Sequence, residues 1–175
     1  MLDDRLMRAM FGESRSIAII GAKDKPGQAV DRVGRYLLEQ GYRIFPVHPV
    51  RKTVWGLPAV TCLAELPEPV DIVNLFRAPE YCPAHAQEVL DLPWKPKVFW
   101  MQLGIRSIEA RQMLARTGMT VVEDSCIMSF ISLWASTMVL SSAALKMCLI
   151  PVMARKNVST AQGKINSAPA LFVRK

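Results

Sequence analysis

The chain has 175 residues, 51% of them hydrophobic and 21% charged, which is enough for one domain with its own core. A formal net charge of +7 would suit a nucleic-acid-binding protein, but six basic residues and no acidic residue follow residue 128, so the part before is nearly neutral. The charge therefore indicates no nucleic-acid partner.

The four cysteines and two histidines are too scattered for a metal site. No Cys-x-x-Cys pair is present, so we expect free thiols, no metal and a cytoplasmic protein. Residues 1–13 mix acids and arginines with apolar residues at helical spacing. They predict a leader helix and not a signal peptide.

Short apolar segments alternate with helical patterns from residue 14 to residue 128. We predict strands over residues 16–20, 42–47, 70–76, 97–101 and 119–122, and helices over 30–40, 79–90 and 107–117, the last capped by Ser107. The run SIAII is apolar, as in a parallel strand that is buried on both faces. The predicted fold class is α/β: a Rossmann-like three-layer α/β/α domain with a five- to six-stranded, mostly parallel sheet.

Residues 127–145 carry no charge, at the lower edge of the length that a transmembrane helix needs. Six serines and threonines in this stretch weaken the membrane interpretation. We weigh a helix packed on the domain or on a partner subunit, a membrane or interfacial anchor, which is not favoured, and a non-native or disordered extension. Residues 129–175 are therefore treated as an apolar, then basic C-terminal extension of undecided structure.

Four loops follow the predicted strands, and parallel sheets bind ligands beyond these strand ends. They read GAKDKPG, VHPVRK, FRAPE and MQLGI in chain order. In the first loop, Gly21 allows a tight turn, while Lys23 and Lys25 stand beside the start of a helix, where backbone N–H groups attract phosphate. The pattern is not G-x-G-x-x-G, so it predicts either a phosphate site or an ordinary surface turn.

The second loop distinguishes between nucleotides. An NAD-binding unit needs a carboxylate after its second strand, where this chain reads VHPVRK. The basic Arg51 and Lys52 suit a phosphorylated ribose instead, as in NADP or coenzyme A. The alternative is that both are solvated residues of a loop.

The third and fourth loops contribute mixed polar and apolar groups. Phe76 can cover an apolar surface, and Arg77 offers a fork of donors to phosphate. Gln102 offers an amide at a strand end, and Gly104 permits close approach of the backbone. No histidine is near Cys126 in sequence to activate it, and no other pattern resembles a nucleophile or an acid–base pair, so we lean toward a binding module and not an enzyme.

Taken together and in order, these segments resemble the stand-alone coenzyme A-binding domain family, which is similar to the N-terminal domain of the succinyl-CoA synthetase alpha subunit. The resemblance is carried by IAIIGAKDKPG, RVGRYLLEQGYRIFPVHP, WGLPAV, PVDIVNLFRAPE, VFWMQLGI and VVEDSCIM, about two thirds of the chain. It implies a Rossmann-like domain that holds coenzyme A or an acyl-CoA along the strand ends. The synthetase reaction is not implied, because the chain has no room for the further domains that carry it.

The resemblance also implies which part of coenzyme A each group of candidate site residues would contact. The phosphates would lie at Gly21, Ala22, Lys23 and Lys25, the adenosine end near Val47, Pro49 and Arg51, and the pantetheine arm beside Phe76, Arg77, Gln102 and Gly104. Two alternatives stay open: an NADP-dependent oxidoreductase, and an accessory subunit that docks a homo-oligomer or a larger enzyme partner through residues 129–150.

Overall fold

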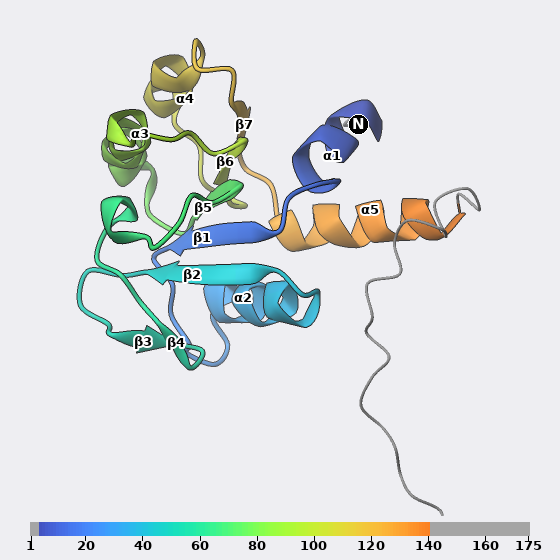
Figure 1. Cartoon of the computed structure of the whole chain (residues 1–175), viewed down its shortest axis with the longest axis horizontal. Helices are drawn as coiled ribbons and strands as arrows, with labels where there is room; N and C mark the ends of the chain where they lie inside the picture. Colours follow the sequence, from blue (N-terminus) through green and yellow to red (C-terminus); the bar gives the residue numbers. More distant parts are fainter. Residues whose placement is uncertain (1–3, 141–175) are drawn as a thin grey trace, which may run out of the picture.

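A five-stranded parallel sheet forms the centre of the computed structural model, which describes residues 4–140 (Figure 1). In spatial order its strands are β2 (Arg43–Val47), β1 (Ser16–Ile20), β5 (Ile72–Leu75), β6 (Val98–Met101) and β7 (Thr120–Val122). Every neighbouring pair runs parallel. The predicted Rossmann-like α/β fold is confirmed, with five strands in the main sheet.

Helices cover both faces of the sheet. One face carries α1 (Asp4–Phe11), α2 (Ala29–Glu39) and α5 (Ile127–Leu140), and the other carries α3 (Cys82–Asp91) and α4 (Ile108–Leu114). Successive residues of a strand point to opposite faces, so Ile17 and Ile19 join the first core while Ala18 and Ile20 join the second. This alternation explains why β1 is apolar throughout.

Trp100 ties the two terminal helices to the sheet. Its fully buried ring lies 5.8 Å from the ring of Phe11 in α1 and 5.2 Å from that of Phe130 in α5. The indole N–H donates to the Ser125 carbonyl at 2.6 Å. Burying a ring of this size contributes about 4–6 kcal/mol. The described part of the uncharged segment is therefore a helix that packs on the domain, with Ile127 inside the core.

No helix among residues 4–140 combines the length and apolarity that crossing a membrane requires. The rest of the C-terminal extension, residues 141–175, lies outside the described residues.

A small hairpin that the sequence pattern did not predict covers the free edge of β2. It consists of β3 (Thr53–Val54) and β4 (Leu57–Pro58), joined by a turn in which Trp55 and Gly56 both have positive φ, the geometry that tight hairpins favour. The hairpin is followed by the short helix η1 (Leu63–Glu65). Beyond β4, Val60 bridges to β2 through Pro46, a residue that has no N–H to donate.

Trp55 fixes this hairpin on α2. Its indole N–H donates to Asp31 at 2.8 Å, and this hydrogen bond, before the contribution of Arg35, lowers the pKa of the Asp31 carboxyl. The ring lies so close to Gly34 that a Cβ there would stand 2.2 Å from it. The loop between β2 and β3, which carries Arg51, is thereby held at both ends.

The predicted helix over residues 79–90 divides in two. The structure has a single turn, η2 (Pro79–Tyr81), before α3 begins at Cys82. Pro83 lies in the first turn of α3, where a missing N–H costs nothing.

Candidate functional site

The strand order reverses at β1, and three of the predicted loops meet there. β2 lies on one side of β1 and β5 on the other, so the loops that follow them diverge, and open α/β sheets have their binding crevice at such a point of the carboxyl edge. Gly21 donates to the Val47 carbonyl at 2.9 Å, and Phe76 donates to the Ile20 carbonyl at 2.9 Å. The ends of all three strands are thus joined by backbone hydrogen bonds.

Gly21 has to be glycine at this junction. Its φ is +81°, and a Cβ would stand 2.4 Å from the Phe76 carbonyl oxygen. The next residue, Ala22, is fully buried and also approaches the Val47 carbonyl, at 3.4 Å. The first loop therefore leaves β1 in a single fixed direction.

Three cationic side chains, one from each of these loops, act electrostatically on His48. Burial and then the charges of Arg51, Lys23 and Arg77, in that order, lower the pKa of the His48 imidazole. Lys23, Arg51 and Arg77 lie far apart in the sequence, yet the charges of all three act on the same imidazole. The fold thus gathers them at the crevice, where they would attract a polyanion.

His48 itself shapes the second loop. Its Nδ1 accepts hydrogen bonds from the backbone N–H groups of Val50 at 3.2 Å and Arg51 at 3.1 Å. Because the imidazole accepts twice at this nitrogen and its pKa is lowered, it is neutral at neutral pH. The ring supports the turn that presents Arg51.

Among residues 4–140, no carboxylate forms an ion pair with Arg77. Its guanidinium stacks over the ring of Tyr81 with 5.3 Å to the ring centroid, and its Nε is buried with no hydrogen-bond partner. An orphaned buried donor is costly unless a ligand or water satisfies it. The side chain is half-buried at the crevice and keeps its charge available.

Arg51 does have an acidic partner, and sequence reasoning missed it. The Arg51 Nη1 atom lies 2.5 Å from the Asp24 carboxylate, which comes from the first loop, GAKDKPG. In the sequence, no carboxylate follows the second strand directly, which favoured a phosphorylated ribose over NAD. The structure brings a carboxylate to that place from another loop, although an arginine there neutralises it.

The protein-family model described as CoA binding domain matches residues 15–131 of this chain. The chain belongs to the coenzyme A-binding domain family. It is 38% identical over 121 residues to the uncharacterized protein YneT of Bacillus subtilis (strain 168), which covers 69% of this chain and 88% of YneT.

Solved structures of similar proteins share the fold. A Thermus thermophilus protein, cell-free ID.343, is 38% identical, with a TM-score of 0.71 over 76% of this chain and 99% of its own. A hypothetical protein of Pyrococcus horikoshii OT3 is 27% identical, with a TM-score of 0.72 over 77% of this chain and 93% of its own. Both matches span nearly the whole of the other chain, so the CoA-binding domain is the unit that these proteins share.

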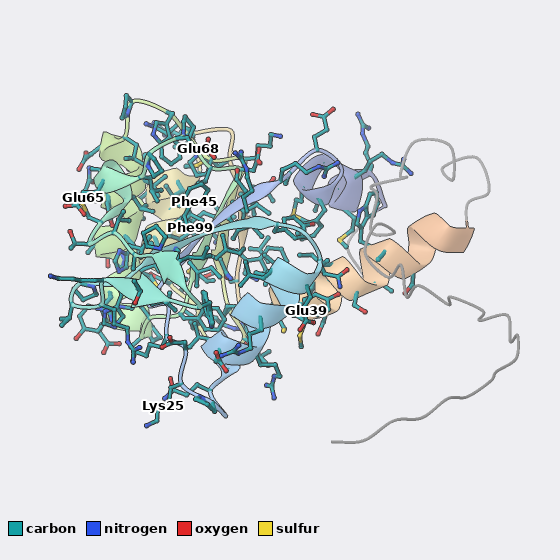
Figure 2. The ribbon with its side chains drawn as sticks, turned by 60° about the horizontal axis from the view of Figure 1, so that its bottom comes forward. Lys25, Glu39, Phe45, Glu65, Glu68 and Phe99 are labelled. Carbon is teal, nitrogen blue, oxygen red and sulfur yellow. The ribbon has the colours of Figure 1, made fainter. Side chains whose placement is uncertain are left out.

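Four further predicted site residues of the CoA-binding domain are not among the groups that act on His48. Lys25 is exposed and projects from the outer end of the first loop (Figure 2), and Pro49 is exposed as well. Gln102 is buried and donates to the Asn74 side chain at 3.0 Å, while the Gly104 N–H donates to Asp124 at 2.6 Å. Their roles stay predictions.

Asn74 is a second orphan donor that the sequence did not reveal. It is fully buried on β5, and its Nδ2 has no partner although its Oδ1 accepts from Gln102. In the sequence VNLF, Asn74 interrupts an otherwise apolar strand. A polar residue at that place is the signal that could have been followed, because buried amides need partners.

A cavity in the described part of the CoA-binding domain lies elsewhere on the same edge. Its volume is about 790 Å³, and it is lined by η2, α3, α4 and the end of β7. It shares no residue with the cationic cluster, and we give more weight to the cluster because three loops converge there. Within residues 4–140, no group of three His, Cys, Asp or Glu side chains could hold a metal ion.

Proposed function

We propose that this domain binds coenzyme A or an acyl-CoA at the junction of β1, β2 and β5, and that it does so as a binding module without turnover. The observation that carries the proposal is that Lys23, Arg51 and Arg77 stand on three loops whose strand ends are joined by backbone hydrogen bonds, and that their charges all act on His48. Coenzyme A carries a ribose 3′-phosphate and a diphosphate, so it offers two anionic groups to such a cluster. Membership of the CoA-binding domain family supports the same ligand.

The chemistry of the site favours binding over catalysis. His48 is the histidine of the crevice, and its Nδ1 is already engaged by two backbone N–H groups. Arginine and lysine side chains hold phosphate but do not transfer protons readily near neutral pH. The described residues of the crevice thus supply a cradle for anions and no poised base.

Calorimetric titration of the full chain tests the ligand. Coenzyme A should bind more tightly than dephospho-coenzyme A, which lacks the 3′-phosphate, and more tightly than NADPH. Arg51→Ala should weaken coenzyme A binding about tenfold or more, because hydrogen bonds to charged groups contribute about 1.5–3 kcal/mol each. No heat of binding at millimolar coenzyme A, or a preference for NADPH, would overturn the proposal.

A matched control lies at the start of β2, whereas Arg51 follows the end of that strand. Arg43 begins β2 at the opposite edge of the sheet, where it pairs with Glu68 at 2.7 Å. Arg43→Ala removes the same charge from the chain as Arg51→Ala. It should leave the affinity for coenzyme A unchanged, so a loss in both variants would indicate a general charge effect and no defined site.

A further inference from the structure

The three cations of the site differ in one respect. Within the described residues, Lys23 and Arg77 have no carboxylate within ion-pair distance, whereas Arg51 is paired with Asp24 at 2.5 Å. Asp24 stands between two lysines of the loop GAKDKPG. The site therefore carries its own anion, placed on one particular arginine.

This ion pair joins two of the loops that follow the strands at the point where the strand order reverses. Asp24 belongs to the loop after β1, and Arg51 to the loop after β2, so the pair links two loops that would embrace a ligand. Both side chains are more than a third exposed, at 36% and 38%. Exposed pairs contribute little to stability, so a ligand can exchange partners here at small cost.

We propose that Asp24 is a built-in competitor for ligand phosphate on Arg51, which lowers the affinity for a phosphorylated ribose and leaves the affinity for an unphosphorylated one unchanged. The inference rests on the proposed function. A phosphate monoester carries close to two negative charges and can replace a carboxylate on a guanidinium, whereas a ribose hydroxyl cannot. Asp24 thus tunes selectivity at the phosphate and eases release of the ligand.

The opposite role, in which Asp24 prepares Arg51 for the ligand, is less consistent with the geometry. The backbone of Arg51 is already fixed by its hydrogen bond to His48 at 3.1 Å. Asp24 contacts Nη1, one of the nitrogens that a phosphate would use.

The test is Asp24→Asn in the full chain, titrated with coenzyme A and with dephospho-coenzyme A. Coenzyme A should bind about two- to fivefold more tightly, the range that an exposed ion pair allows, while binding of dephospho-coenzyme A should not change. In an Arg51→Ala background the same substitution should have no effect, because the competed group is gone. Thermal unfolding of each variant establishes that it is folded.

Glu39→Gln provides the charge control. Glu39 ends α2, at the far end from the loop that carries Asp24 and Lys25 (Figure 2). This variant should bind both ligands like the unchanged chain. Weaker coenzyme A binding in Asp24→Asn, or the same gain with Arg51 absent, would overturn the inference while the proposed function stands. A chain that binds neither ligand would overturn both.

Discussion

The two halves of the sheet's carboxyl edge differ in how their basic side chains are paired with carboxylates. Beyond β6 and β7, Arg106 pairs with Asp124 at 2.6 Å and Arg111 lies 3.7 Å from Glu123. The same acids also accept from the backbone of Gly104 and Ser107. Beyond β2, β1 and β5, Lys23 and Arg77 lack an acidic partner among the described residues, and Arg51 has one that is exposed.

This difference in ion pairing indicates which half of the edge can accept an anion. At the β6–β7 half, a phosphate would have to break ion pairs that hold the loops together. At the half beside β1, it would meet cations whose interactions are incomplete, including the orphaned Nε of Arg77. Both halves have the same parallel strand ends, so the proposed place of the ligand depends on the pairing of charges and not on the topology alone.

Gly21→Ala should have the largest effect and should disrupt only the half beside β1. A side chain at φ +81° costs about 1–2 kcal/mol, and the 2.4 Å approach to the Phe76 carbonyl adds about 1–3 kcal/mol of overpacking. Denaturant unfolding should show the loss of stability, and calorimetry the loss of coenzyme A binding.

Gly27→Ala is the matched control, since Gly27 has φ +84° but nothing within 4 Å of an added Cβ. It should cost only the backbone strain of about 1–2 kcal/mol. Equal losses in the two variants would show that the backbone angle matters and that the contact between β1 and β5 does not.

Exchanging arginines for alanine on either half tests the charge comparison directly. Arg77→Ala should weaken coenzyme A binding about tenfold, because an unpaired cation at the crevice loses its contact with phosphate. Arg106→Ala should leave that affinity unchanged, because its charge is used by Asp124. Calorimetric titration of both variants provides the measurement. A loss of coenzyme A affinity that is confined to Arg106→Ala would place the ligand at the half beyond β6 and β7.

The sequence predicted those features that depend on local pattern. The apolar run of β1 and the cap of α4, where Ser107 accepts from the Ala110 N–H at 3.2 Å, were both predicted. The two-residue strands β3 and β4 are too short to show any periodicity, so the hairpin was missed.

Contacts between distant loops could not be predicted either. The loops that carry Lys23, Arg51 and Arg77 were identified, since each follows a strand, but their convergence on His48 needs the strand order. Sequence also could not show that Asp24 reaches across 27 positions to Arg51, or that the Gln102 amide turns toward Asn74. Partner choice depends on side-chain geometry that the chain order does not contain.

The smallest expected effect is a change in how His48 titrates. Burial, followed by three cations, lowers its pKa below the ordinary value of about 6.5. As the pH falls, the unfolded chain therefore takes up a proton on His48 at a higher pH than the folded, ligand-free protein does. The stability that neutral His48 contributes is complete above pH 6.5 and declines as the pH falls toward the lower, folded pKa.

A bound anion should reverse part of that shift. Coenzyme A phosphates would offset the charges of Lys23, Arg51 and Arg77, so the His48 pKa should rise when the ligand binds, while burial continues to lower it. By linkage, affinity should then increase as the pH falls below 6.5. An NMR titration of the His48 ring proton, with and without coenzyme A, measures both curves, and His85, which pairs with Glu88 on α3, serves as the internal reference. A midpoint for His48 that stays in place or falls on binding would mean that the phosphates do not lie among these three cations.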